Sequence, residues 1–177
     1  GSDALAKAQG RLAEETMAVT DWQLVGLTQN EDGTLTTVDG DPQMILENVD
    51  GRVVRTISYT AQFDGEAREM CLYYTTKVGE DYSADRRVFP QSVGEGRYIY
   101  TLPRTSLAAL RLDPCSPEEN KTVTLAVRDI TLHAARRVAV FCADVVPGVL
   151  PGALPGLGSR RREHDFCGTQ KRKIITE

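Results

Sequence analysis

Residues 51–77 constrain the fold of this chain most, because apolar and polar residues alternate along two consecutive arms of the stretch. An Asp64-Gly65 pair, which favours the tight turn of a β-hairpin, separates the two arms. The alternation places the following residues on one apolar face: Val53, Ile57, Tyr59, Ala61, Phe63, Met70, Leu72 and Tyr74. Alternation of this length predicts two paired strands with one face in a core and the other in water.

The sequence outside residues 51–77 predicts further β-strands. Strand patterns cover residues 22–27, 43–49, 97–102, 107–112, 122–132 and 137–146, although 107–112 also fits a short helical turn. With the hairpin, these make about eight strands joined by short, mainly sequential connections, which is typical of an up-and-down barrel or a β-sandwich. Residues 3–17 are rich in good helix formers and predict a short helix within an N-terminal segment, residues 1–20.

The length and composition predict one domain, and the C-terminal residues predict an irregular segment at its end. A chain of 177 residues with 41% hydrophobic and 26% charged residues predicts a single globular domain. Residues 147–158 repeat Pro-Gly followed by an apolar pair, which excludes a regular helix and disfavours a strand. This irregular Pro/Gly-rich segment either covers the mouth of a barrel or acts as a linker, and a basic tail completes residues 147–177.

The charge and the hydropathy of the sequence argue against a nucleic-acid partner and against a membrane span. The net charge of -4 argues against a nucleic acid as the main partner. No apolar run approaches the roughly 18 residues of a membrane helix, so we expect no membrane span. Gly1-Ser2 is typical of a cloning remnant, so a signal peptide would already be missing.

The cysteines and one sequon favour a secreted, extracellular glycoprotein. Four cysteines stand at widely spaced positions without the C-x-x-C spacing of a zinc or redox site: Cys71, Cys115, Cys142 and Cys167. Asn120-Lys121-Thr122 is an N-glycosylation sequon in a polar stretch that predicts an exposed loop. We therefore expect two disulfide bonds and glycosylation at Asn120.

Motifs of catalysis are missing from the sequence. His133 and His164 have no nucleophile beside them in a known motif, and Cys167 near His164 is better explained as a half-cystine. No glycine-rich loop opens a helix after a strand, as a phosphate site would require. We expect a binding protein rather than an enzyme, with no cofactor and no metal.

Three residues carry a resemblance to the lipocalin family. Trp22 lies on the first predicted strand, Cys71 begins a central strand 49 positions later, and Cys167 stands near the C-terminus. The chain resembles a lipocalin in this pattern, which implies an all-β, up-and-down β-barrel with a short N-terminal helix. The resemblance also implies a Cys71–Cys167 disulfide, a second bridge between Cys115 and Cys142, and a Trp22 that closes the barrel floor.

The sequence also departs from the lipocalin pattern. Thr20-Asp21 precede Trp22 where the family has a Gly-x-Trp motif. The family's Thr-Asp-Tyr motif has at best a remnant in Arg128-Asp129. Pro-Gly repeats stand where the family has its long helix after the last strands.

The apolar face of the predicted sheet supplies a candidate ligand site. Its candidate residues are Ile57, Tyr59, Phe63, Leu72, Tyr74, Tyr98 and Tyr100, whose aromatic rings with polar tips suit a cavity for an apolar ligand. Arg55 is in phase with Val53 and Ile57, so the alternation points its guanidinium inward, where it needs a carboxylate from another side chain or from the ligand. This predicts a secreted carrier that sequesters and transports a small hydrophobic ligand, a fatty acid or other lipid-like molecule. A protein receptor is a second candidate partner.

The alternative is a β-sandwich interaction domain. In such a domain the same aromatic residues fill the core, and a protein partner binds to the polar loops 30–41 and 78–96 or to a sheet edge. A Cys71–Cys142 bridge between two sheets would favour this alternative, whereas Cys71–Cys167 would favour the barrel.

Overall fold

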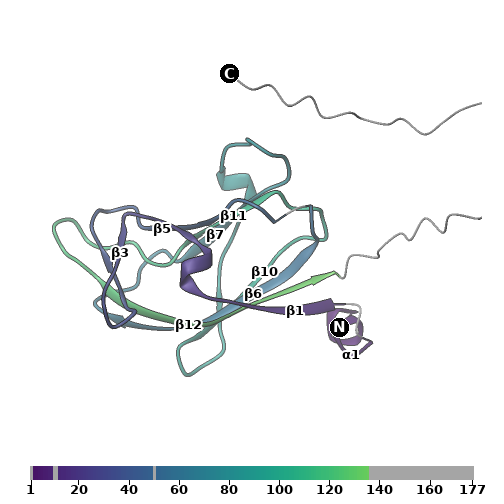
Figure 1. The fold of residues 1–177 in the computed structure, drawn as a ribbon, viewed down its shortest axis with the longest axis horizontal. Coiled ribbons are helices and arrows are strands. Elements are labelled where there is room, and N and C mark those ends of the chain that lie inside the picture. Colours follow the sequence, from purple (N-terminus) through teal and green to yellow (C-terminus); the bar gives the residue numbers. More distant parts are fainter. Residues whose placement is uncertain (1, 10–11, 50, 136–177) are drawn as a thin grey trace, which may run out of the picture. The chain divides into compact units, whose positions relative to one another are not determined.

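The computed structural model describes residues 2–9, 12–49 and 51–135, and Figure 1 shows their arrangement. The helices are α1 (Ser2–Ala8) and two short 3₁₀ helices, η1 (Val19–Asp21) and η2 (Ala84–Arg86). The strands are β1 (Leu12–Met17), β2 (Gln23–Val25), β3 (Leu27–Gln29), β4 (Leu35–Thr37), β5 (Gln43–Leu46), β6 (Val54–Asp64), β7 (Cys71–Thr75), β8 (Arg87–Val88), β9 (Gln91–Ser92), β10 (Arg97–Thr101), β11 (Ala109–Asp113) and β12 (Thr124–Ala135). The expectation of a mainly β protein is confirmed.

The described strands form two antiparallel sheets. One has seven strands in the order β3-β4-β12-β6-β10-β9, with β1 paired to the second half of β12. The other has five strands in the order β2-β5-β11-β7-β8. The buried side chains of both sheets belong to one hydrophobic core, so the architecture is a β-sandwich, the alternative considered above.

The expectation of a lipocalin-like barrel is therefore wrong. In an up-and-down barrel each strand pairs with its neighbours in sequence and the sheet closes on itself. Here β12 lies between β6 on one side and β1 and β4 on the other, and no described strand pair joins the two sheets. Alternation within a strand is the same in both architectures, because each buries one face of every strand.

The expectation that residues 51–77 form a β-hairpin is also wrong, because the two strands do not pair with each other. Both arms are strands, β6 and β7, and their apolar faces both point into the core. However, β6 pairs with β10 and β12, whereas β7 pairs with β8 and β11 in the other sheet. The chain after Asp64 thus crosses between the sheets instead of turning back beside β6.

The aromatic residues predicted to line a ligand cavity are packed core residues. Tyr59, Tyr100, Ile57 and Leu72 are fully buried, and Phe63, Tyr74 and Tyr98 pack against the same core. The ring centroids of Tyr59 and Tyr100 are 5.9 Å apart, and their hydroxyls share a hydrogen bond of 3.1 Å. The expected lipid-binding cavity, and with it the carrier function, is not supported by this packing, since the polar tips satisfy each other rather than a ligand.

The β6–β12 pair contains two β-bulges, and the one at Arg55 explains why this side chain does not point inward as expected. Arg128 pairs with Thr60 and Thr131 with Ser58, so β12 has one extra residue at Asp129, whose φ is +55°. A second register shift, in which Ala134 pairs with Val54, gives β6 one extra residue at Arg55. The shift turns Val54 into the core instead of Val53.

Arg55 consequently points to the outer face of the seven-stranded sheet. Its Nη2 donates to Oδ2 of Asp3 at 2.8 Å, and its Nη1 donates to the carbonyl of Leu102. The guanidinium, whose side chain is 12% exposed, thus has a carboxylate partner from α1. Hydrogen bonds from Arg55 and the charges of Arg55 and Arg104 lower the pKa of Asp3.

Trp22 is part of the core at 4% exposure, immediately before β2. The predicted strand 22–27 is divided, because β2 belongs to the five-stranded sheet and β3 to the seven-stranded sheet. Gly26 joins them at φ +63°, in the left-handed region that favours glycine, and a Cβ there would meet the side chain of Asp39. Glycine therefore permits the chain to pass from one sheet to the other at this point.

The described strands lie within one compact unit, Gly1–Ala139. The predicted strand 137–146 and the segment 147–177 lie outside the described residues, as do Cys142, His164 and Cys167. The expectation of one domain over residues 1–177 stays a prediction. Among the described residues, no helix combines the length and apolar character needed to cross a membrane.

Candidate functional site

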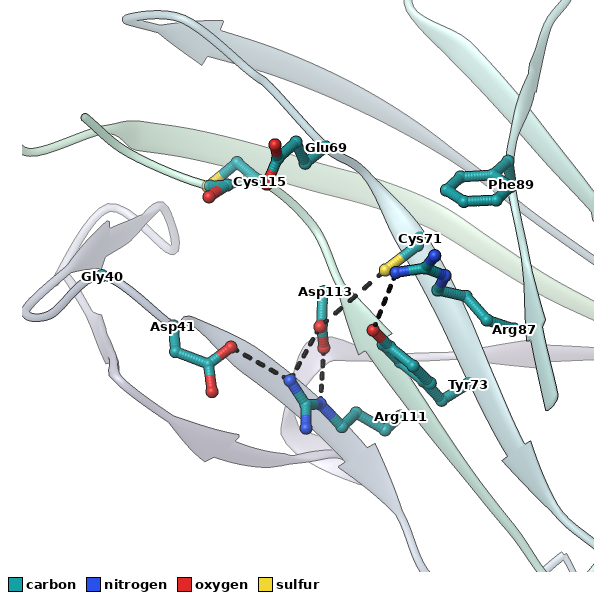
Figure 2. A pocket seen from close by; sticks show the side chains of 11 residues that line it. Gly40, Asp41, Glu69, Cys71, Tyr73, Arg87, Phe89, Arg111, Asp113 and Cys115 are labelled. Atoms are coloured by element: carbon teal, nitrogen blue, oxygen red, sulfur yellow. Dashed lines mark hydrogen bonds and ion pairs between the residues drawn. The ribbon is translucent and has the colours of Figure 1, made fainter. Parts of the chain in front are cut away.

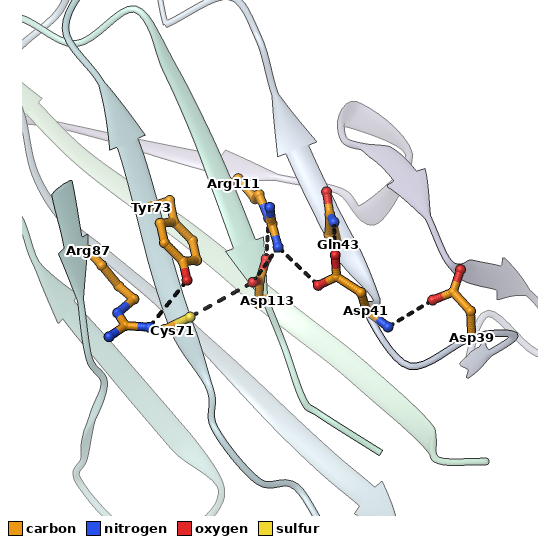
Figure 3. Close-up of polar contacts among 8 residues, drawn as sticks. All are labelled: Asp39, Asp41, Gln43, Cys71, Tyr73, Arg87, Arg111 and Asp113. Carbon is orange, nitrogen blue, oxygen red and sulfur yellow. Dashed lines mark hydrogen bonds and ion pairs between the residues drawn. The ribbon is translucent and has the colours of Figure 1, made fainter. Parts of the chain in front are cut away.

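The candidate site lies on the outer face of the five-stranded sheet. Leu72, Leu110 and Leu112 of β7 and β11 point into the core, so the residues that alternate with them point outward. Tyr73 is paired in register with Arg111 of β11 on one side and with Arg87 of β8 on the other. Three outward side chains from three neighbouring strands therefore form one row, Arg87–Tyr73–Arg111 (Figure 3).

Guanidinium groups and aromatic rings interleave along this row. The Cζ atom of Arg87 is 4.9 Å from the ring centroid of Phe89 and 5.7 Å from that of Tyr73. The Cζ atom of Arg111 is 5.0 Å from the Tyr73 ring and 6.0 Å from the Tyr82 ring. Each guanidinium thus lies within about 6 Å of two ring centroids, the range of a cation–π contact.

Carboxylates fix the position of Arg111. Its Nε and Nη2 donate to the two oxygens of Asp113 at 2.7 and 2.8 Å, and Nη2 also donates to Asp41 at 3.0 Å. Gln43 donates to the second oxygen of Asp41 at 2.6 Å, which continues the network toward the edge of the sheet (Figure 3). The network presents a guanidinium that is already ordered before a ligand arrives.

Burial changes the ionisation of two groups beneath this network. Asp113 is 9% exposed, and burial raises its pKa even though hydrogen bonds from Arg111 lower it. The Cys71 thiol lies 3.9 Å from Oδ2 of Asp113, and burial together with the Asp113 charge raises the thiol pKa. A thiol of this kind is a poor nucleophile at neutral pH.

These residues line a solvent-open groove of about 410 Å³, shown in Figure 2. Tyr73, Arg111 and Asp113 rise from its floor, while Asp41 and Phe89 lie on opposite sides. Phe89 is 62% exposed, so much of its ring meets solvent beside the groove. The groove thus combines an exposed apolar ring with fixed donors and acceptors.

The sequence indicated part of this groove through the alternative of an interaction domain, since its expected binding loops, residues 30–41 and 78–96, contain Asp41, Arg87 and Phe89. Tyr73, Arg111 and Asp113 were not predicted as site residues, because they fall on predicted strands or at a strand end. The one available signal was the pair of charged residues alternating with Leu110 and Leu112, since charges on a mainly apolar strand mark its outer face. Of the predicted ligand-binding residues, only Leu72 and Tyr74 belong to this sheet, on its inner side. Ile57, Tyr59, Phe63, Tyr98 and Tyr100 lie on the inner side of the seven-stranded sheet, and Arg55 lies on its outer face.

The remaining predicted residues lie away from the groove, apart from two cysteines. Cys71 and Cys115 border it as free, buried thiols, and their implied partners Cys167 and Cys142 lie outside the described residues. The disulfide bonds therefore stay predictions. Asn120 is exposed in a turn, and its glycosylation also stays a prediction.

His133 lies on the seven-stranded sheet, away from the groove. Its Nδ1 shares a hydrogen bond with the Thr56 hydroxyl and its Nε2 one with Glu14. In the part of the chain that the structure describes, no group of three His, Cys, Asp or Glu side chains is arranged to hold a metal ion.

Comparisons with known proteins return little. No family model matches the chain, and no curated protein matches it. One solved structure, described as a new low affinity xylan binding module from the gut symbiont Roseburia intestinalis, aligns with a TM-score of 0.43 and 13% identity. The alignment covers 69% of this chain and 94% of that one, and a likeness of this size is too weak to assign a fold or a ligand.

Proposed function

We propose that this protein is an extracellular binding module that holds a carbohydrate on the outer face of its five-stranded sheet. The observation that carries the proposal is the row Arg87–Tyr73–Arg111, flanked by the exposed ring of Phe89 and open to solvent. The extracellular location rests on the cysteines and the sequon, and on no structural observation.

The chemistry of the groove matches that of a sugar ring. A pyranose has apolar C–H faces and a rim of hydroxyl groups, so it is recognised by a flat apolar surface with hydrogen-bonding groups beside it. Phe89 supplies the apolar surface, Arg87 supplies donors, and Asp41 supplies acceptors at the rim. Because Asp113 already orders Arg111, binding costs little side-chain entropy at that position.

The site favours binding over catalysis. Glycoside hydrolysis generally needs two carboxyl groups that face the substrate, one of them free to give a proton. Both oxygens of Asp113 accept hydrogen bonds from Arg111, and the carboxylate lies at 9% exposure beneath the row. Its interactions are those of a residue that positions Arg111.

A protein partner is the second candidate. Tyrosine and arginine are the side chains that most often dominate protein interfaces, and the row contains both. Among the described strands, the edge strands β2, β3, β8 and β9 have two or three residues each, whereas β1 has six and pairs only with β12. A protein ligand would therefore bind either on the groove face or as an added strand beside β1.

The proposal is tested with a glycan microarray, followed by isothermal titration calorimetry with the polysaccharides that bind. Phe89→Ala and Arg87→Ala should each weaken binding about 10-fold or more, because each removes part of the recognition surface. Val93→Ala is the matched control, since Val93 is also an exposed apolar residue but lies in the turn between β9 and β10. The proposal fails if no glycan binds, or if Phe89→Ala and Arg87→Ala bind as the wild type does.

A further inference from the structure

We propose that the ligand is a linear oligosaccharide that lies along β7 and β11 and occupies two hollows in succession, rather than a single sugar ring. The inference rests on the proposed carbohydrate function and adds to it the shape of the ligand and a second binding region. It is carried by a second hollow on the outer face of the same sheet.

The second hollow has a volume of about 510 Å³, and its lining includes Glu47, Thr75, Lys77, Tyr82 and Ala109. Thr75 and Ala109 are paired in register on β7 and β11. They form the outward row next to Tyr73–Arg111, which is followed in turn by Cys71–Asp113. The two hollows therefore lie over consecutive outward rows of the same two strands.

Together the two hollows span more than one sugar ring. Ala109 in the second hollow stands four positions before Asp113 in the first, which corresponds to about 13 Å of extended strand. A monosaccharide in the groove beside Phe89 would leave the second hollow empty. An oligosaccharide that continues in the direction of the strands would fill both hollows.

Arg111 joins the two hollows. It lines the first hollow, and its guanidinium lies between Tyr73 of the first hollow and Tyr82 of the second, at 5.0 and 6.0 Å from their ring centroids. An oligosaccharide that crosses Arg111 would contact the Tyr73 ring, the Arg111 guanidinium and the Tyr82 ring in that order. This arrangement suits successive sugar residues, each with an apolar face and polar rim.

The second hollow repeats the chemistry of the first. Tyr82 supplies an aromatic ring, Lys77 a donor and Glu47 an acceptor. Glu80, which also lines it, is already engaged by Thr76 and Arg86 and so serves to hold the loop in place. The second region thus provides contacts that only a longer ligand can reach.

The test uses ladders of xylo-, cello-, manno- and galacturono-oligosaccharides from one to six units, measured by calorimetry with the whole chain. For a ladder that binds, the wild-type affinity should rise about 10-fold or more with length and then stop rising once both hollows are filled. Tyr82→Ala should weaken binding of the long members about 10-fold and leave the shortest bound member within about twofold. Phe89→Ala should weaken all members, and Val93→Ala none.

Lys77→Ala provides a second variant in the same hollow that removes an exposed side chain with little risk to folding. It should also weaken only the long members. If affinity does not depend on length and both variants bind as the wild type does, while Phe89→Ala weakens binding, the two-hollow inference is overturned and the carbohydrate function stands. If the wild type binds no ladder and no array glycan, both fail.

Discussion

Arg111 donates from two nitrogens to both carboxylate oxygens of Asp113, although the two residues stand only two positions apart on β11. The spacing of two places both side chains on the outer face of the sheet. The pair holds the guanidinium against the ring of Tyr73 and makes it part of the floor of the groove. The geometry of the candidate site thus depends on a carboxylate that lies beneath it.

The buried position of Asp113 predicts a specific pH dependence of stability. Burial raises the pKa of Asp113 above the ordinary value of 3.8, so the folded protein binds this proton more tightly than the unfolded chain does. The contribution of Asp113 to the free energy of unfolding is therefore greatest below pH 3.8 and decreases as the pH rises through the raised pKa.

Urea unfolding of the wild type and of Asp113→Asn between pH 3 and pH 8 checks this expectation. The wild-type stability minus the variant stability should decrease with rising pH across that window. Val93→Ala, which removes no titrating group, should keep the wild-type profile. A difference that increases with pH would show that the ion pair with Arg111 outweighs the burial of the carboxylate.

The paired hydroxyls of Tyr59 and Tyr100 predict strong coupling in the core. Tyr59→Phe leaves the buried Tyr100 hydroxyl without the partner it has in the structure, which should cost about 1–3 kcal/mol of unfolding free energy. The Tyr59→Phe/Tyr100→Phe double variant should lose less than the sum of the single variants, because it leaves no orphaned hydroxyl.

Denaturant unfolding of the four proteins of this cycle measures the coupling. Tyr74→Phe, which changes a partly buried tyrosine of the same core, is the matched control and should show no coupling to Tyr100. Additive effects of the two substitutions would contradict the observed pairing and would suit rings that face a solvent-filled cavity.

The bulge at Asp129 predicts which side chains β12 accepts there. With φ at +55°, Asp129 occupies the left-handed region, where a β-branched residue is strained by about 1–2 kcal/mol. Asp129→Val should therefore destabilise the protein by about that amount, whereas Asp129→Gly should be close to neutral or stabilising. Thermal unfolding checks the order, and Arg128→Val on the adjacent exposed position controls for the new apolar side chain. Equal stability of the Val and Gly variants would be incompatible with the bulge.

The two described cysteines predict slow thiol chemistry in the reduced, folded protein. Burial raises the pKa of the Cys115 thiol to about 11 and also raises that of Cys71, so little thiolate is present at neutral pH. Alkylation by iodoacetamide at pH 7.5 should be slow in the folded protein and fast after unfolding in urea, with each site read by mass spectrometry.

The same experiment without reductant tests the implied disulfide bonds. Thiols that stay unreactive in urea until reductant is added would support bridges to Cys142 and Cys167. Rapid labelling of Cys115 in the folded, reduced protein would contradict its burial.

The sequence by itself determined the mainly β character, most strand positions and the inward faces of β6 and β7. These are local properties, because alternation with a period of two follows from strand geometry whatever the strand pairs with. Tyr59, Tyr100 and Leu72 were correctly placed on the apolar side for this reason. Their assignment to a ligand cavity was wrong because the alternation does not show whether a face meets a cavity or a second sheet.

Only the tertiary structure decided how the strands pair and where the candidate site lies. Separating β6 and β7 into different sheets depends on contacts between residues far apart in the chain, such as Thr56 with His133. The bulge at Arg55 reverses which residues face the core at that end of β6. The Arg55 guanidinium therefore lies at the surface and not in the core. The groove needs Asp41, Phe89 and Arg111 from separate segments to meet on one face, and no local pattern in the sequence brings them together.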